Sequence, residues 1–126
     1  MVTSTRSAYL SKEELAETLG IREALVRQWT RDGVIPPHFY NVDGHAYRYA
    51  SVTVALGELM LELGRFFGDN SPLPKIIARQ AVPALEVAWQ EQAPAQLSVR
   101  SGAFELRGPL SCIDSARQKL AAFAAA

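Results

Sequence analysis

The chain has 126 residues, with 13 basic and 13 acidic side chains and an apolar fraction of 48%. This length suits one ordinary domain or two very small ones, and the apolar fraction excludes a wholly disordered chain. The formal net charge of zero excludes a uniformly basic molecule, so a nucleic-acid-binding patch would have to come from the placement of the charges.

The sequence predicts a cytoplasmic protein with no membrane partner. Residues 1–7 are polar and predict no signal peptide. The longest apolar stretch, residues 54–67, is interrupted by charged side chains and is not expected to span a bilayer. Cys112 is the single cysteine, so no disulfide can form within the chain, which is typical of a reducing compartment.

Two short helices are predicted near the N-terminus. The first covers residues 12–19, because Ser11 and Glu14 form a capping-box pattern and Gly20 marks a helix end. The second begins near Arg22 and ends before Gly33. Its apolar side chains share one face; they are Leu25, Val26 and Trp29.

A β-hairpin and a longer helix are predicted next. Residues 39–49 have the pattern of two short strands around an Asp-Gly turn. Ser51 is expected to cap a third helix that ends near Phe67. Its predicted apolar stripe consists of Val52, Leu56, Leu59, Leu63 and Phe66, and further apolar residues predict that it buries more than one face.

The chain beyond the Gly68–Pro72 linker predicts a helix, a hairpin and a helix. Pro83 is expected to kink or split the first of these helices. A two-residue loop at Ser101-Gly102 would pair Val99 with Phe104 and Leu97 with Leu106. The final helix, which starts near Ser111, is the expected cover of this hairpin. Its apolar stripe consists of Ile113, Ala116, Leu120 and Phe123.

No catalytic, metal or cofactor pattern is present in the sequence, so the prediction is a protein that is not an enzyme. His38 and His45 flank the predicted turn, but no cysteine or carboxylate cluster joins them at the spacing of metal ligands. Cys112 has no CxxC partner, and an inert thiol is expected.

The strongest pattern in the sequence is a helix-turn-helix over residues 11–33. Ala16, Gly20 and Val26 supply the small, turn-tolerant and apolar residues that two touching helices need. A helical hairpin with no role in DNA binding fits the same pattern. The predicted hairpin that follows makes this a winged version. Four arginines are expected to cluster on one face, namely Arg22, Arg27, Arg31 and Arg48.

Residues 9–67 resemble the DNA-binding domain of the MerR transcription regulators and the related excisionase-type winged helices. The similarity rests on residues 10–21, on Val26-Arg27-Gln28-Trp29 with the exit Gly33-Val34-Ile35-Pro36, and on Ala46-Tyr47-Arg48-Tyr49-Ala50-Ser51. The resemblance implies a recognition helix in the major groove and duplex DNA as the partner. It implies phosphate contacts by Arg27 and Arg48, and a DNA-backbone contact by Trp29.

Eleven residues are the candidates for DNA contact. They are Ser11, Arg22, Glu23, Ala24, Arg27, Gln28, Trp29, Arg31, Tyr47, Arg48 and Tyr49. Packing could equally be the role of Tyr47 and Tyr49, and packing is the expected main role of Trp29. The family often has arginine where Ala24 stands, so the sequence that is read must differ. The family's long dimerisation helix is not expected here, because Pro83 and Pro94 interrupt it.

The sequence therefore predicts an α+β protein with two parts. Residues 1–70 would form the winged helix-turn-helix, and residues 71–126 a small helix–hairpin–helix module that dimerises the chain or binds a protein partner. The predicted function is sequence-specific binding of double-stranded DNA by a homodimeric, nucleoid-associated transcription regulator. An architectural role in phage or plasmid excision, packaging or partition is the first alternative, and a winged-helix protein-interaction module is the second.

Overall fold

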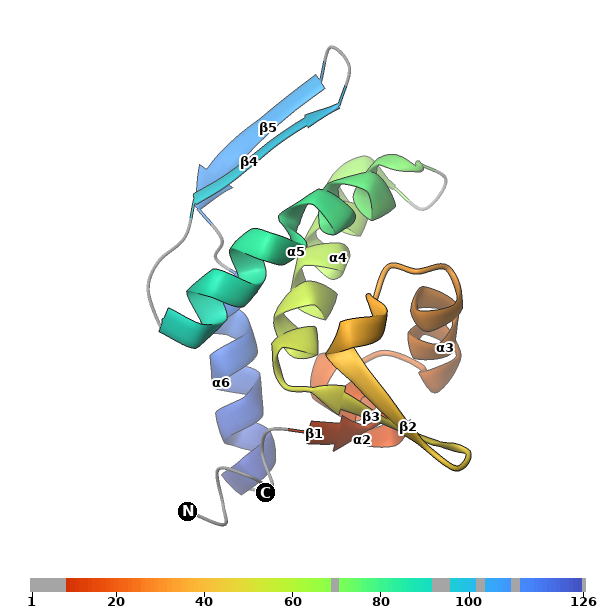
Figure 1. The fold of residues 1–126 in the computed structure, drawn as a ribbon. Helices are drawn as coiled ribbons and strands as arrows, with labels where there is room; N and C mark the ends of the chain where they lie inside the picture. Colours follow the sequence, from red (N-terminus) through yellow and green to blue (C-terminus); the bar gives the residue numbers. More distant parts are fainter. Residues whose placement is uncertain (1–8, 69–70, 92–95, 102–103, 110–111, 126) are drawn as a thin grey trace.

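The computed structural model describes residues 9–68, 71–91, 96–101, 104–109 and 112–125. Within these ranges it is an α+β fold, as the sequence predicts (Figure 1). The helices and strands follow in the order β1 (Tyr9–Ser11), α2 (Lys12–Leu19), α3 (Glu23–Arg31), the 3-10 turn η1 (Pro37–Phe39), β2 (Tyr40–Asp43), β3 (Ala46–Ala50), α4 (Val52–Phe67), α5 (Leu73–Glu91), β4 (Gln96–Ser101), β5 (Phe104–Pro109) and α6 (Cys112–Ala125).

Helices α2 and α3 form where the sequence predicts them. The Ser11 hydroxyl accepts from the Glu14 backbone N–H at 3.1 Å, and the Glu14 carboxylate accepts from the Ser11 N–H at 2.9 Å, so the capping box is complete. Gly20 ends α2 in the left-handed conformation at φ 73°. The next helix therefore begins only three residues later.

The predicted β2–β3 hairpin belongs to a three-stranded antiparallel sheet with the strand order β1-β3-β2. Asp43 pairs with Ala46, which leaves Gly44 (φ 64°) and His45 as the two-residue loop. Strand β1, which pairs Leu10 with Tyr49, was not predicted. It is three residues long, and its partner lies about forty residues further along the chain, so no local pattern indicates it.

Helix α4 is the centre of the molecule and buries more than one face, as predicted. All residues from Thr53 to Met60 are buried. Gly57 allows α2 to approach closely, because a Cβ at this position would lie 2.4 Å from the Leu19 side chain. Two expectations were wrong: Ser51 stands at the N-cap without a side-chain hydrogen bond, and Phe66 is 76% exposed. Phe66 is the second-last residue of α4, and no described residue covers it.

Helices α5 and α6 both pack against α4 (Figure 1). Helix α5 continues through Pro83, so the predicted split does not occur. Pro83 is exposed, and solvent can hydrate the carbonyl group that loses its N–H partner there. Arg117 of α6 lies 5.0 Å from the centre of the Trp89 ring and donates to the Trp89 carbonyl at 3.0 Å, which closes the end of α5.

The second hairpin differs from its prediction in register and in cover. Val99 pairs with Leu106 and Ser101 with Phe104, so the register is shifted by two residues from the predicted one. Helix α6 is not the cover of this hairpin, because strand β4 lies beside α5 while α6 packs on α4. Ile113 and Ala116 are buried as predicted, Leu120 is half-buried, and Phe123 lies outside the residues whose side chains are described.

The buried side chains form one continuous cluster. It extends from Leu10 through α4 to Ala116 and therefore includes residues from both sides of the predicted boundary at residue 70. The division into two modules stays a prediction. None of the described helices is long and apolar enough to cross a membrane.

Candidate nucleic-acid interface

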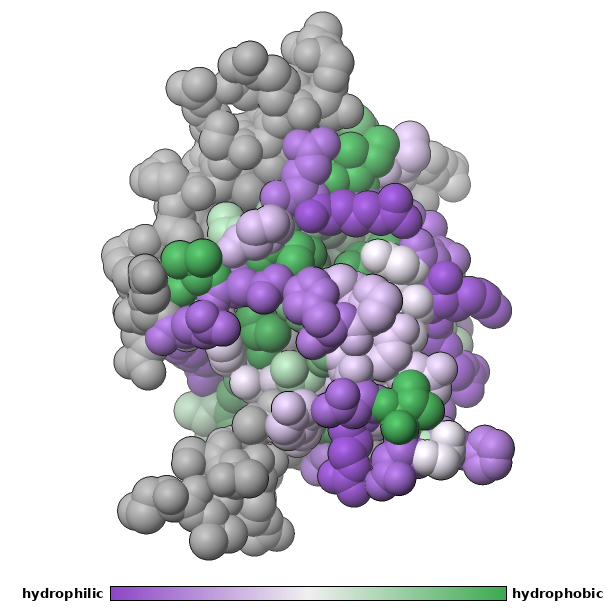
Figure 2. Space-filling model, in the orientation of Figure 1, coloured by the Kyte–Doolittle hydropathy of each residue, from purple (hydrophilic) through white to green (hydrophobic). Residues whose placement is uncertain are grey.

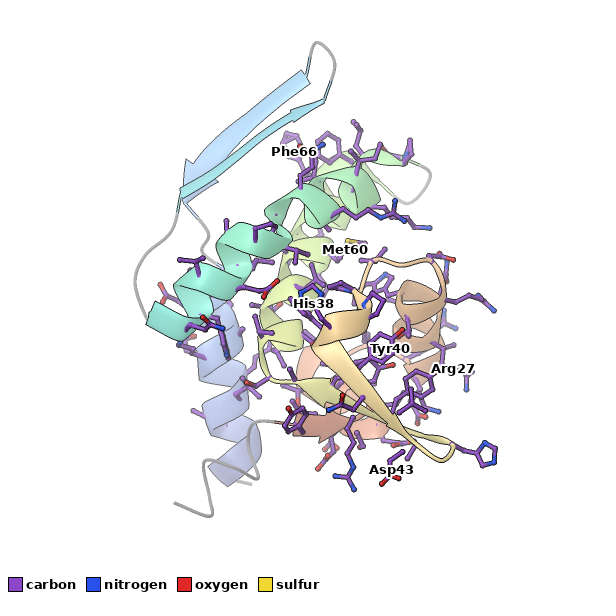
Figure 3. All side chains as sticks on the ribbon, viewed as in Figure 1. Arg27, His38, Tyr40, Asp43, Met60 and Phe66 are labelled. Carbon is purple, nitrogen blue, oxygen red and sulfur yellow. The ribbon has the colours of Figure 1, made fainter. Side chains whose placement is uncertain are left out.

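The outer face of α3 carries four exposed side chains: Ala24, Arg27, Gln28 and Arg31. Val26 and Trp29 point the other way and are 0% and 6% exposed. In Figure 3 Arg27 lies on the outer side of α3, whereas Met60 of α4 lies on its inner side. The 3.6-residue period therefore divides α3 into a core face and a polar face, and nothing in the described part of the chain covers the polar face.

The β2–β3 hairpin is held beside this helix by a tyrosine cluster. The hydroxyls of Tyr49 and Thr30 lie 2.8 Å apart, and the Thr30 hydroxyl also donates to the Val26 carbonyl at 2.9 Å. The Tyr40 and Tyr47 rings lie 5.6 Å and 6.1 Å from the Tyr49 ring. Burial raises the pKa of Tyr49, so its hydroxyl stays protonated at neutral pH.

Arg48 does not share a face with these tyrosines. Successive side chains of a strand point to opposite sides of the sheet, so Arg48 lies on the side away from Tyr47 and Tyr49. Its cross-strand neighbours there are Ser11 and Asn41. The expected cluster of four arginines on one face is therefore corrected: Arg48 lies on the other side of the hairpin.

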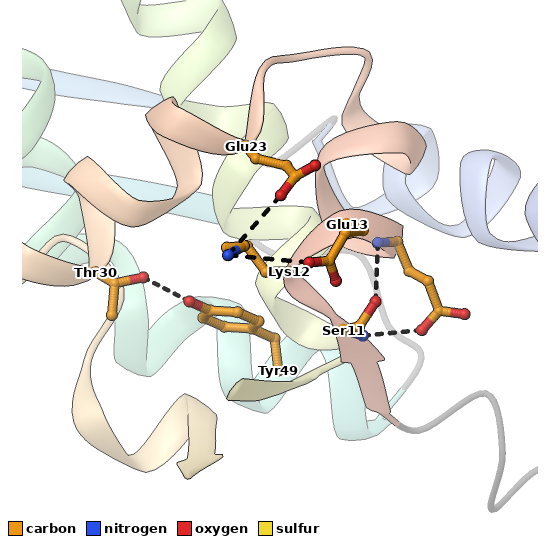
Figure 4. A network of polar contacts seen from close by, with 7 residues as sticks. Ser11, Lys12, Glu13, Glu23, Thr30 and Tyr49 are labelled. Atoms are coloured by element: carbon orange, nitrogen blue, oxygen red, sulfur yellow. Dashed lines mark hydrogen bonds and ion pairs between the residues drawn. The ribbon is translucent and has the colours of Figure 1, made fainter. Parts of the chain in front are cut away.

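Local charge along α3 is positive although the whole chain is neutral. Arg22, Arg27 and Arg48 are exposed and make no ion pair with any residue that the structure describes. The acidic residue on this helix, Glu23, is paired with Lys12 at 3.8 Å (Figure 4). In Figure 2 hydrophilic residues gather along the edge formed by α3 and the hairpin. Such a surface favours an anionic partner.

The end of α3 is fastened to α5 by polar contacts. Lys75 donates to the Asp32 carboxylate at 2.8 Å, and this hydrogen bond is the main cause that lowers the pKa of Asp32. The Arg79 guanidinium donates to the Asp32 carbonyl at 3.0 Å. His38 and Glu86 add a contact of 2.7 Å between η1 and α5. These pairs lie more than forty residues apart in the sequence, so no motif predicts them.

The structure separates the eleven predicted contact residues into two groups. One group is exposed; it consists of Arg22, Glu23, Ala24, Arg27, Gln28, Arg31, Tyr47 and Arg48. The other group has structural contacts, because Ser11 caps α2 while Trp29 and Tyr49 are 6% and 1% exposed. The backbone contact that the family resemblance implies for Trp29 is therefore not available to most of this side chain.

Neither the two histidines nor Cys112 indicates a metal site or a reactive thiol among the described residues. The described residues include no group of three or more His, Cys, Asp and Glu side chains placed to hold a metal ion. Cys112 is 1% exposed, and burial raises the pKa of its thiol to about 12, which keeps it protonated and poorly nucleophilic.

The chain was compared with protein-family models, with curated proteins and with solved structures, and none of them matches it. Inference about function therefore depends on the residues and geometry of α3 and its hairpin.

Proposed function

We propose that this protein binds double-stranded DNA in a sequence-specific manner and acts as a transcription regulator. The observation that carries the proposal is the uncovered polar face of α3, with Arg27, Gln28 and Arg31, beside an exposed hairpin. An α-helix fits the major groove, where arginine and glutamine side chains recognise guanine and adenine edges. Arg22 and Arg48 are both exposed and would supply contacts to phosphates in this proposal.

In this proposal α2 and α3 are the two helices of a winged helix-turn-helix, with α3 as the recognition helix and β2–β3 as the wing. The left-handed Gly20 turn and the Thr30–Tyr49 hydrogen bond support it. The arrangement agrees with the resemblance to MerR-type and excisionase-type domains. Ala24 stands on the outer face and would allow close approach to the bases.

The salt dependence of binding tests the proposal most directly. With about four to eight phosphate contacts per dimer, affinity should fall ~10²–10⁴-fold between ~50 and ~200 mM salt. Arg27→Gln should weaken binding and flatten the salt slope by about one unit per bound subunit. Arg65→Gln is the matched control, because Arg65 is also exposed but lies on α4. No gel shift on any duplex at low salt would contradict the proposal.

A homodimer completes the proposal, because one helix-turn-helix reads only a few base pairs. Phe66 on α4 is 76% exposed and Val87 on α5 is 53% exposed. Large apolar side chains exposed in this way suit a surface between subunits. Sedimentation of the wild type and of Phe66→Ser tests this idea: the variant should dissociate more readily while its melting temperature stays the same. Selection from random duplexes should then return a palindromic consensus, and a monomer with and without DNA would contradict the dimer.

A further inference from the structure

An open groove of about 1000 Å³ runs along the side of α3 that faces α4 and α5. Side chains from α3, from the second half of α4 and from the start of α5 line it. The residues that carry the argument are Arg22, Leu25, Trp29, Met60, Arg65 and Lys75. The groove adjoins the outer face of α3 and shares Gln28 with it, but its floor consists of side chains that α3 turns inward.

The lining combines positive charge with an apolar floor. Arg22, Arg65 and Lys75 contribute three basic groups, and none of the described residues that line the groove is acidic. Lys75 is bonded to Asp32, whereas Arg22 and Arg65 make no ion pair with a described residue. Leu25, Trp29 and Met60 present apolar surface between these basic groups. A ligand with an anionic group and an apolar body could therefore contact the basic side chains with the first and the apolar floor with the second.

We propose that this groove binds a small amphipathic anion, with a carboxylate or sulfonate held by Arg22 and Arg65 and an aromatic or aliphatic body on Trp29 and Met60. The volume is that of pockets that take drug-sized ligands, which typically pair apolar walls with a few polar groups. The apolar floor favours such a molecule over a DNA phosphate, which is polar on every side. The basic side chains favour an anion over a neutral ligand, because they can form charge-assisted hydrogen bonds to it.

Binding at this groove would change the DNA interface, a consequence that rests on the proposed function. Arg22 and Gln28 line the groove and also belong to the exposed DNA-contact group. A bound anion would neutralise Arg22 and compete for Gln28. The ligand should therefore weaken DNA binding, and DNA should weaken ligand binding by the same factor.

Gly64 offers a variant that fills the groove without disturbing the fold. It lines the groove on α4, and a Cβ at this position would meet no heavy atom within 4 Å. Gly64→Leu should therefore place a side chain in the groove while α4 keeps its helix, since leucine is a better helix former than glycine. Its melting temperature should be no lower than that of the wild type.

The probe is the fluorescent aromatic sulfonate anilinonaphthalenesulfonate, with the uncharged phenylnaphthylamine as its matched control. We expect one sulfonate per chain, with binding at least tenfold tighter than that of the neutral analogue. Arg65→Gln should weaken sulfonate binding about tenfold, Gly64→Leu should abolish it, and Arg27→Gln should leave it unchanged.

Three outcomes would overturn the inference. The first is undiminished sulfonate binding by Gly64→Leu, and the second is equal binding of the sulfonate and the neutral dye. The third is an Arg65→Gln variant that binds the sulfonate normally but loses DNA affinity, which would assign the groove to the DNA backbone. A chain that binds the sulfonate at this groove but binds no DNA would contradict only the proposed function.

Discussion

Tyr49 holds the hairpin in place beside the outer face of α3. Its hydroxyl reaches Thr30 at 2.8 Å from a ring that is 1% exposed. Tyr49→Phe should lower the free energy of unfolding by about 0.5–1.5 kcal/mol, and DNA affinity should fall because the hairpin is less firmly oriented. Tyr47→Phe is the control, since the Tyr47 hydroxyl has no hydrogen bond to a described residue. Equal effects of both variants in denaturant melts would show that the Thr30 contact contributes nothing.

Substitution of Trp29 is expected to lower the stability of the fold, whereas substitution of Arg48 is expected to lower DNA affinity alone. Trp29 is 6% exposed in the core, so Trp29→Ala should cost about 3–5 kcal/mol and lose DNA binding through unfolding. Arg48 is exposed, so Arg48→Ala should change stability by less than about 0.5 kcal/mol and weaken binding to all sequences alike. Thermal melts measured beside binding curves test the pair. A stable Trp29→Ala that merely loses DNA would restore the backbone contact implied by the family resemblance.

Cys112 should be unreactive in the folded chain. Burial raises its pKa from 9.0 to about 12, so at pH 8 the native thiol remains almost wholly protonated. Because the folded pKa is the higher one, this residue stabilises the fold below pH 9 and loses that contribution as the pH rises toward about 12. Alkylation by iodoacetamide at pH 8 should be slow and should accelerate on addition of denaturant. Fast labelling of the native chain would refute this expectation.

Lys119 connects three helices. Its ammonium lies 2.8 Å from the carboxylate of Glu58 on α4, which is 7% exposed, and 3.5 Å from the Leu19 carbonyl at the end of α2. Helix α6 is therefore bound to the helix that precedes α3 as well as to α4. This contact provides a route by which the C-terminal part of the chain supports the proposed recognition helix.

Lys119→Met should destabilise the protein by about 1–3 kcal/mol, because it leaves the Glu58 carboxylate buried without its partner. The double variant with Glu58→Met should regain most of this loss. Lys12→Met is the matched control: Lys12 pairs with the exposed Glu13 and Glu23 at 3.9 and 3.8 Å, and its loss should cost below about 1 kcal/mol. Chemical denaturation measures all three, and a double variant less stable than Lys119→Met would contradict the buried-charge explanation.

Helices α5 and α6 supply part of the hydrophobic core around α4. Ile77, Leu85 and Ala116 are each 0% exposed. Removal of residues 71–126 should therefore abolish cooperative unfolding of the remaining chain as well as any dimer, because it exposes the apolar face of α4 to water. Circular dichroism melts of residues 1–70 and of the full chain test this. A sharp transition close to that of the full chain would show that the N-terminal part is an independent domain.

A feature could be predicted from the sequence when it depends on residues close together in the chain. Helix α2 was predicted to the residue because its start and end depend on Ser11, Glu14 and Gly20, which interact only with their near neighbours. The second hairpin was predicted as a hairpin, but its register was wrong by two residues. A shift of two keeps every side chain on its face, so the alternation of apolar residues could not distinguish the two registers.

The helices, the turns, the β2–β3 hairpin and the polar face of α3 could all be predicted from the amino-acid sequence, since each depends on contacts between residues close in the chain. Packing between elements distant in the sequence set which side chains stay exposed. It buried Tyr49 but left Tyr47 exposed, left Phe66 uncovered near the end of α4, and placed Arg48 away from the tyrosines. The groove beside α3 and the attachment of α6 to α2 arise only when elements distant in sequence pack together, because no local pattern records which neighbour a face will meet.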